Sequence, residues 1–223
     1  MEETGYRFNR NYEETARLRD GTRAKLRTIR ASDKQLLLEG FERLSPRSRY
    51  TRFLAPKQKL SDRELRYLTE VDGIDHFALV ALKQPIFGQE EGIGVGRFVR
   101  LANQPDTAEP AITVADDQQG KGLGTILLHR LLDAAWERGI RQFRCELLAD
   151  NSRMRELLAE IDTDVLIDHV EDGALVVTFP VEAPVPEEHR HLSSSVRRAL
   201  TYLAQELVSF IPRATRHREE RDR

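Results

Sequence analysis

The sequence predicts a mixed α/β or α+β fold, in which a central sheet packs against helices. Helical and strand periods alternate in the order β-α-α-α-β-β-β-α-β-α-β-β. The 39% of hydrophobic residues can form a core, while 32% of charged residues cover the surface. A length of 223 residues fits one main domain with shorter flanking segments. We expect an N-terminal extension, the main domain, a proline-containing linker, and a C-terminal amphipathic helix with a charged tail, over residues 1–20, 21–181, 182–192 and 193–223.

The first half of the main domain is expected to hold one strand and three helices. Residues 24–30 alternate in strand fashion, with some breaks in register. Ser32 with Gln35, and Ser61 with Glu64, form the capping-box pattern that marks the start of a helix. The three helices are expected over residues 32–43, 47–53 and 61–70.

The second half is expected to be rich in strands. The glycines of residues 92–96 are interpreted as part of a strand, because strand residues rather than a helix follow them. Gly139 is interpreted as the glycine that ends a long helix with a buried stripe. The strands are expected over residues 77–82, 92–101, 110–115, 143–148, 165–170 and 175–181, with a turn over 103–107. The helices are expected over residues 123–138, 151–161 and 195–211.

Composition and charge argue against several classes of protein. The 35 Lys and Arg residues balance 37 Asp and Glu residues, whereas a nucleic-acid-binding domain is strongly basic. The longest apolar runs, such as residues 78–82, are far shorter than the roughly 20 residues of a membrane-spanning helix. The charged N-terminus does not resemble a secretory signal. We therefore expect a cytoplasmic protein with no membrane span and no nucleic-acid partner.

Metal and thiol chemistry are not expected. Cys145 is the single cysteine, which excludes an intrachain disulfide and a cysteine-rich zinc site. It lies on an expected core strand, so we interpret it as a buried, unreactive thiol. His189 and His191 lie beside Glu187 and Glu188 in the linker, but no further ligand accompanies them. We interpret that group as a solvated turn and predict no metal.

A glycine-rich segment before the long helix is the most informative part of the sequence. Gly120, Gly122 and Gly124 stand where side chains would cap the helix. Helix N-terminal amides, bare backbone and the charge of Lys121 together favour a phosphate or pyrophosphate ligand. The alternative is a flexible glycine-rich loop, but a strand before it and an amphipathic helix after it favour the anion site. The segment lacks the Gly-Lys-Ser/Thr of a Walker loop and the later acidic residue of a dinucleotide fold.

The same segment resembles the acetyl-CoA motif of the GNAT superfamily of N-acetyltransferases. Gln119-Gly120-Lys121-Gly122-Leu123-Gly124, after a strand ending near Val114, is similar to the family pattern Arg/Gln-x-x-Gly-x-Gly/Ala. Asn151 to Met154 resembles the family's Asn-x-x-Met junction between a strand and a helix. The likeness spans about residues 21–181 and implies a mixed, mostly antiparallel sheet flanked by helices. Three further segments resemble the Pat-type protein lysine acetyltransferases, at residues 44–53, 60–64 and 108–111.

The resemblance implies acetyl-CoA as co-substrate. The backbone from Ile112 to Val114 would pair with the pantetheine arm, and the amide near Val114 would polarise the thioester carbonyl. Asn151 would contact the pantetheine, or act as a plain helix N-cap. The pyrophosphate would bind the amides of a loop and helix start made of Gln119, Gly120, Lys121, Gly122, Leu123, Gly124 and Thr125.

The resemblance also implies direct attack of an amine on the thioester. A lysine amine has a pKa of roughly 10.4, so a base must remove its proton at neutral pH. Glu109 matches the glutamate base of Pat-type enzymes, and burial would raise its pKa; the alternative is a solvated charge at a strand end. Asp116 and Asp117 are weaker candidates, because acids beside a phosphate site more often shape the turn. Residues 151–161 hold no tyrosine to protonate the thiolate, which is a tolerable leaving group with a thiol pKa of roughly 8.5.

We therefore predict an N-acetyltransferase that moves acetyl from acetyl-CoA to a primary amine, with a protein lysine as the acceptor. A small-molecule amine acceptor and a non-catalytic CoA-binding regulatory module stay open as alternatives. The basic residues of segment 43–66 are interpreted as a solvated helical face, with an acidic substrate or the CoA 3′-phosphate as the alternative partner. The helix over 195–211 is expected to pack on its own domain, with a homodimer or membrane-surface contact as the alternatives.

Overall fold

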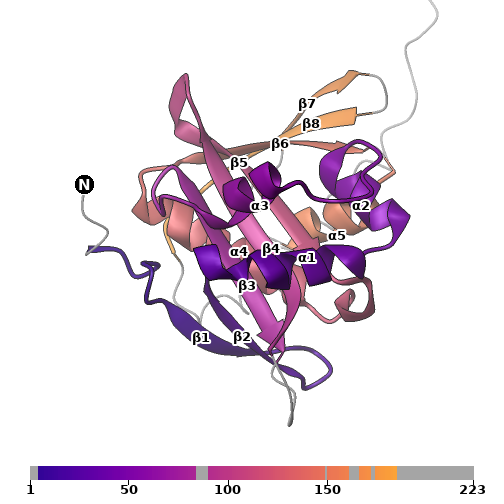
Figure 1. Ribbon diagram of the computed structural model, residues 1–223. Helices are drawn as coiled ribbons and strands as arrows, with labels where there is room; N and C mark the ends of the chain where they lie inside the picture. The colour runs from indigo at the N-terminus through magenta and orange to yellow at the C-terminus, as the bar shows by residue number, and fades with distance from the viewer. Residues whose placement is uncertain (1–4, 84–89, 149, 161–165, 172–173, 185–223) are drawn as a thin grey trace, which may run out of the picture. The chain divides into compact units, whose positions relative to one another are not determined.

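A computed structural model describes residues 5–83, 90–148, 150–160, 166–171 and 174–184 of the protein (Figure 1). One sheet of eight strands runs through these residues in the order β1-β2-β3-β4-β5-β6-β8-β7. Neighbouring strands are antiparallel except β5 and β6, which are parallel. The strands are Glu13–Arg17 (β1), Arg23–Thr28 (β2), His76–Lys83 (β3), Glu91–Leu101 (β4), Gln104–Val114 (β5), Gln142–Leu148 (β6), Leu166–Glu171 (β7) and Ala174–Pro180 (β8).

Helices cover both faces of this sheet, which confirms the predicted fold class. α1 to α3 lie on one face, and α4 and α5 lie on the other (Figure 1). The helices are Lys34–Glu42 (α1), Pro46–Phe53 (α2), Asp62–Thr69 (α3), Leu123–Glu137 (α4) and Ser152–Glu160 (α5), with short 3-10 turns at Ala31–Asp33 and Asp116–Gln118. Within these described ranges, no helix has both the length and the apolar character that crossing a bilayer requires. The expected helix over 195–211 and the histidines of the linker lie outside the described residues.

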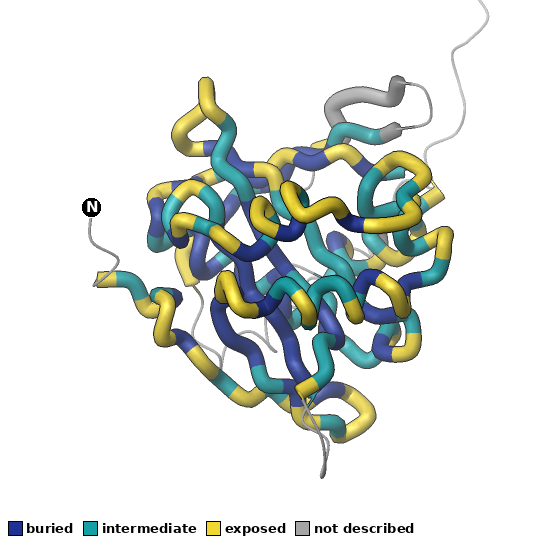
Figure 2. The backbone as a smooth tube through the Cα atoms, viewed as in Figure 1, coloured by how far each residue is buried: buried dark blue, intermediate teal, exposed yellow. Residues whose placement is uncertain are grey.

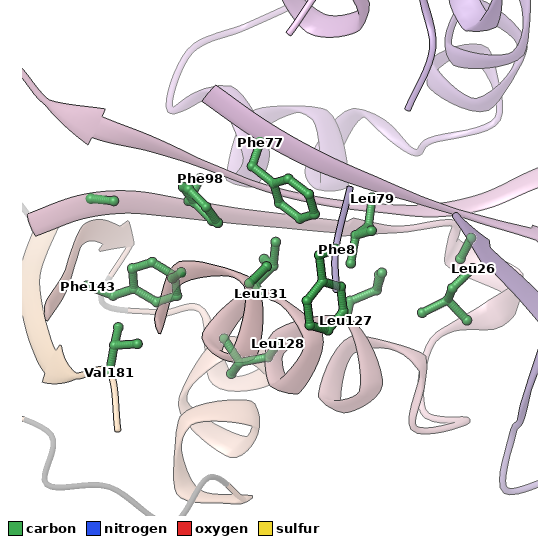
Figure 3. Packing of buried hydrophobic residues seen from close by; sticks show 14 of the residues in the cluster. Phe8, Leu26, Phe77, Leu79, Phe98, Leu127, Leu128, Leu131, Phe143 and Val181 are labelled. Atoms are coloured by element: carbon green, nitrogen blue, oxygen red, sulfur yellow. The ribbon is translucent and has the colours of Figure 1, made fainter. Parts of the chain in front are cut away.

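A row of phenylalanine rings forms the centre of the main core. Phe8, Phe77, Phe98, Phe143 and Phe179 follow one another with ring centroids 5.4 to 6.4 Å apart. They come from the N-terminal segment and from β3, β4, β6 and β8, so the row ties distant parts of the chain together. α4 closes this core from one side of the sheet, as Figure 3 shows. The buried stretches of the tube in Figure 2 follow the central strands, where most of the apolar surface is removed from water.

Residues 5–20 belong to the folded unit, which corrects their interpretation as an extension. Glu13–Arg17 forms β1, an edge strand that pairs with β2. The Phe8 side chain is 0% exposed, and its carbonyl accepts a hydrogen bond from Arg138 Nη2 at 2.7 Å. The sequence pattern missed β1 because none of its five residues is fully buried, so it lacks the apolar alternation of a half-buried strand.

The first helix does not begin with the predicted Ser32 capping box. A 3-10 turn precedes α1, and the Asp33 carboxylate accepts the Arg30 N–H at 2.8 Å. The same carboxylate forms a two-pronged ion pair with Arg27, at 2.7 and 2.8 Å, with both side chains 7% exposed. The buried guanidinium therefore sets the helix start, because an unpaired charge at this depth would be costly.

Two other local signals are confirmed, and one turn is shorter than expected. The Ser61 hydroxyl accepts the Glu64 N–H, and Glu64 accepts the Ser61 N–H, so this capping box is present. Gly139 ends α4 at a φ of 75°, a conformation that glycine adopts without strain. β5 begins at Gln104, and Thr107 is already buried, so most of the predicted turn over 103–107 is strand.

Candidate functional site

The C-terminal half of β5 has one edge that is hydrogen-bonded to β4 and one edge that faces away from it. The Ala115 N–H donates to the Ile93 carbonyl of β4 at 3.0 Å. Successive residues of a strand direct their N–H and C=O groups to opposite edges. The backbone groups of Ile112 and Val114 therefore point away from β4, towards β6.

This second edge is open, because β5 and β6 diverge. The two strands pair only at Thr107 with Gln142 and at Ala108 with Phe143 among the described residues. Beyond these pairs the polar backbone groups of Ile112 and Val114 lie beside a gap in the sheet. An extended ligand that carries amide groups can pair with such an edge as if it were an added strand.

A glycine-containing loop connects the end of β5 to α4. Gly120 and Gly122 adopt φ angles of 76° and 84°, which side chains rarely tolerate. The Gln119 side chain folds back, and its Nε2 donates to the Val114 carbonyl at 2.9 Å. Gln119 Oε1 is buried and has no hydrogen-bond partner among the described residues. The loop is thus held against the strand end while its backbone stays bare.

The amides of residues 120–125 donate no hydrogen bond to any other described residue. α4 begins at Leu123, and its N-cap Gly122 has no side chain to accept from the first turn. These donors lie at the positive end of the helix dipole. The arrangement is therefore suited to a phosphate or pyrophosphate, as the glycine spacing predicts.

The side chains of two predicted binding residues, Lys121 and Thr125, interact with other side chains of the protein. Lys121 Nζ lies 3.2 Å from an Asp20 carboxylate oxygen and 3.1 Å from Gln118 Oε1. Thr125 Oγ1 donates to Glu160 at 2.6 Å. The expected positive charge beside the loop is partly neutralised by Asp20, which leaves the backbone amides as the groups best suited to an anion.

The side chains of the other predicted residues of this segment are packed in the core, or absent in the case of glycine. The Leu123 side chain is 1% exposed in the core, and those of Ile112 and Val114 pack against the same core. Gly124 lies within α4, where an added Cβ would be 3.7 Å from Leu157, an ordinary contact. The close approach of a ligand therefore depends on Gly120 and Gly122 more than on Gly124.

Asp116 anchors the loop to α2 and does not face the opening as a free acid. Its carboxylate accepts the Ser45 N–H at 2.7 Å and the Ser48 hydroxyl at 2.5 Å. It also lies 3.3 Å from Gln119 Nε2. Burial raises the pKa of Asp116, but the hydrogen bonds from Ser48 and Ser45 outweigh it and hold the pKa below its ordinary value. This agrees with the interpretation that acids here shape the turn.

Asn151 acts as a helix cap. Its Oδ1 accepts the Met154 N–H at 3.1 Å at the start of α5. This is the local role that the sequence also allowed for Asn151. A contact between Asn151 and a ligand stays a prediction.

Glu109 is exposed, so the burial that was expected for this side chain is not present. It pairs with Val99 of β4 and lies on β5 just beyond the last residues that pair with β6. Cys145, on β6, is buried; burial and then the Glu109 charge raise the pKa of its thiol to about 12. The thiol is therefore protonated at neutral pH, in line with the predicted unreactive cysteine.

A cavity that the sequence analysis did not predict lies on the α1–α3 side of β5. It has a volume of about 80 Å³ and is partly open to solvent, and Ala111 and Thr113 of β5 are among the residues that line it. Arg52 of α2 and Arg97 of β4 are its charged residues. Arg52 belongs to the basic segment whose pattern predicts a solvated helical face, and Arg97 is not among the predicted site residues. An arginine within the strand pattern of residues 92–101 was the available signal.

No group of three His, Cys, Asp or Glu side chains suited to a metal ion occurs in the described part of the chain. The two histidines of the linker that were considered as ligands lie outside it.

Comparison with known proteins identifies similar domains. A family model described as the acetyltransferase (GNAT) domain matches residues 23–163. The chain is 32% identical over 191 residues to acetyltransferase Pat of Mycolicibacterium smegmatis. This match covers 82% of the chain and 56% of Pat, so the chain spans about half the length of that relative.

Solved structures agree with this match. The GNAT domain of S. lividans PAT superposes with a TM-score of 0.67 at 31% identity, over 75% of this chain and 96% of that domain. An acetyltransferase of Salmonella typhimurium, solved with its cofactor acetyl-CoA, shares the fold with a TM-score of 0.56 at 19% identity. That superposition covers 73% of this chain and 98% of the Salmonella protein.

Proposed function

Because the chain belongs to the GNAT acetyltransferase family, we propose that it transfers an acetyl group from acetyl-CoA to a primary amine. The observation that carries this proposal is the open edge of β5 beside the unpartnered amides of residues 120–125. One feature fits an extended amide-containing arm and the other fits a pyrophosphate, and the two occur together in CoA. A phosphate site alone would not require the open edge.

The proposed binding mode uses the backbone throughout. The pyrophosphate would accept hydrogen bonds from the amides between Gln119 and Thr125. The pantetheine amides would pair with the backbone of Ile112 and Val114. The Val114 N–H would then point to the thioester carbonyl and stabilise the negative charge that develops on its oxygen.

The proposed reaction is a direct transfer with a carboxylate base. Glu109, directly or through a water molecule, would take one proton from the acceptor ammonium. The free amine would attack the thioester carbon, forming the C–N bond, and the C–S bond would break when the tetrahedral intermediate collapses. CoA would leave as the thiolate, which needs no dedicated acid because the thiol pKa is roughly 8.5. The second amine proton would pass to solvent. Glu109 would return its proton to the CoA thiolate through water, so that one proton is released overall.

A protein lysine is the first acceptor we propose, since 82% of this chain aligns with acetyltransferase Pat. A small-molecule amine is the second candidate, and the partly open cavity beside Ala111 and Thr113 supports it. A CoA-binding module without catalysis is the third. It would bind acetyl-CoA without releasing CoA in the presence of any amine.

An acceptor screen with purified protein separates these candidates. Calorimetry with acetyl-CoA measures binding, and release of free thiol with lysine peptides or small amines measures transfer. Absence of heat and of thermal stabilisation with acetyl-CoA would overturn the assignment. Binding without turnover on any amine would favour the regulatory module.

The role of Glu109 has its own test. Glu109→Gln should lower amine-dependent turnover at least about a hundredfold and leave CoA affinity unchanged, because a positioned base contributes about 10² to 10⁴. Glu156→Gln removes an exposed charge from α5 and serves as the control, with both quantities unchanged. Normal turnover in Glu109→Gln would remove Glu109 from the base role.

A further inference from the structure

The cavity between α1–α3 and the sheet, named here the arginine pocket, is lined mainly by apolar residues, and its charged residues are Arg52 and Arg97. Its apolar walls include Leu37, Phe41, Leu44, Phe53, Leu68 and Val95. Its volume of about 80 Å³ exceeds the roughly 10–15 Å³ that one water molecule needs on the same measure. A small organic molecule therefore fits it better than a single ion or water.

The guanidinium of Arg97 enters this pocket with neutral partners only. The residue is 4% exposed. Its Nη2 donates to the Leu68 carbonyl at 3.0 Å, and its Nη1 lies 3.0 Å from His76 Nε2. Burial, and then the positive charge of Arg97, lower the pKa of His76 to about 4. His76 is therefore neutral at physiological pH and accepts the hydrogen bond without adding or cancelling charge.

Arg52 brings a second positive charge to the same pocket. Its guanidinium lies over the Phe53 ring, 5.0 Å from the centroid, and makes no hydrogen bond or ion pair with another described residue. Burial lowers the pKa of Arg52, and burial with the neighbouring Arg52 charge lowers the pKa of Arg97. Arg97 is buried and Arg52 is half-buried, so holding these two cations side by side is costly unless an anion joins them.

The charges that face this pair are few. The Glu109 charge raises the pKa of Arg52, so its field reaches the guanidinium, whereas Tyr67 is uncharged at neutral pH. No carboxylate forms an ion pair with either arginine in the described structure. Arg97 pairs with Ala111 across β4 and β5, and Glu109 lies two residues further along β5 on the same face. Diagonal neighbours of this kind are about 7–8 Å apart. The proposed base and the arginine pocket therefore belong to one continuous surface.

We propose that the arginine pocket binds the carboxylate of a small organic reactant with an apolar body. A guanidinium recognises a carboxylate through two parallel hydrogen bonds, and the apolar walls favour a short aliphatic or aromatic chain over a hydrated inorganic anion. The inference rests on the proposed acyl transfer, because it treats the bound acid as one of the two reactants. The carboxylate belongs either to the amine acceptor or to the far end of a dicarboxylic acyl group carried by CoA.

The binding test uses 4-methylpentanoate and its neutral amide as probes. Calorimetry on the wild-type protein should give a dissociation constant about ten- to a hundredfold lower for the acid than for the amide, because charge-assisted hydrogen bonds are about twice as strong as neutral ones. Arg52→Gln should lose most of this preference, and it removes no hydrogen bond recorded in the folded protein. Arg63→Gln, an exposed change on α3, is the matched control and should retain the preference.

Arg97→Gln removes hydrogen bonds to Leu68 and His76, so its unfolding curve is compared with that of the wild type before binding is measured. Equal binding of the acid and the amide by the wild-type protein would overturn the proposal. So would an unchanged preference in Arg52→Gln.

Two further measurements identify which reactant carries the carboxylate. If the acceptor carries it, 5-aminopentanoate should have a kcat/KM at least about tenfold above that of pentylamine, and Arg52→Gln should abolish the difference. If the acyl group carries it, succinyl-CoA should bind at least about tenfold more tightly than acetyl-CoA, again only with Arg52 intact. Preference in neither assay, with acetyl-CoA still bound, would reject the arginine pocket as a reactant site and leave the proposed function standing. If the wild-type protein bound neither acetyl-CoA nor succinyl-CoA, the proposed function itself would be rejected.

Discussion

Asp116→Asn tests whether one carboxylate holds the glycine-containing loop between β5 and α4 in place. The substitution keeps the size of the side chain and removes its charge. Asp116 joins the start of α2, through Ser45 and Ser48, to the turn that carries Gln119. If this link positions the loop, its loss should lower both the stability of the fold and the affinity for acetyl-CoA.

The expected magnitude follows from the hydrogen bonds that the carboxylate accepts. The two shortest, from the Ser45 N–H and the Ser48 hydroxyl, measure 2.7 and 2.5 Å. Hydrogen bonds to charged groups contribute about 1.5–3 kcal/mol each, but an asparagine oxygen can still accept one of them. We expect a loss of about 2 kcal/mol in the free energy of unfolding, or roughly 4–8 °C in Tm for a domain of this size. Affinity for acetyl-CoA should fall by about three- to tenfold, because the free amides would be less well placed.

The effect should depend on pH in a defined direction. The folded-state pKa of Asp116 lies below its unfolded value of about 3.9, so its stabilising contribution is fully present above that value and is lost as pH falls through the folded pKa. Urea unfolding should therefore show a constant gap between wild type and variant from pH 7 to pH 5. The gap should narrow below about pH 4.

Asp117→Asn is the matched control, since Asp117 is exposed and accepts only from its neighbour Gln118 among the hydrogen bonds described here. It should leave stability and affinity unchanged. Equal effects of the two substitutions, or a gap that is the same at pH 3 and pH 7, would refute the anchoring role of Asp116.

Other substitutions test the loop, the sheet and the buried ion pair. Gly122→Ala forces a side chain into a φ of 84° at a cost of about 1–2 kcal/mol, and calorimetry should show acetyl-CoA affinity reduced by about tenfold. Gly96→Ala places a Cβ 3.1 Å from Leu131 Cδ1 of α4, which is too close without repacking. Urea unfolding should show a loss of about 1–3 kcal/mol in the free energy of unfolding, and no loss would mean that α4 can shift freely. Asp33→Ala leaves Arg27 as an unpaired buried charge, and the same assay should show a loss of about 3–5 kcal/mol. A loss of less than about 1 kcal/mol in the free energy of unfolding would show that water reaches the Arg27 guanidinium, as it does in exposed ion pairs.

Features that depend on near neighbours in the chain could be predicted from the sequence. The capping box at Ser61, the C-cap glycine at Gly139 and the uncapped glycine-rich start of α4 all follow from local backbone conformation and hydrogen bonding. The same local pattern around Gln119 carried the resemblance to the GNAT superfamily, which the family match confirmed. Such signals survive in a single sequence because they need no knowledge of what the segment packs against.

Features that depend on distant partners were decided by the tertiary structure. β1 has little apolar pattern of its own and becomes a strand because β2 offers it an edge. Glu109 lies at the opening of the sheet because β5 and β6 stop pairing just before it, and Lys121 turns to Asp20 because β1 and β2 bring that residue to the loop. Arg97 lies in an apolar cavity only because α1 to α3 fold over its side of the sheet. The sequence by itself determined where the chain turns, where helices are capped and where a helix start is left without a cap. Strand order and helix placement decided which charges meet, because contacts between remote segments arise only when a shared core has brought them together.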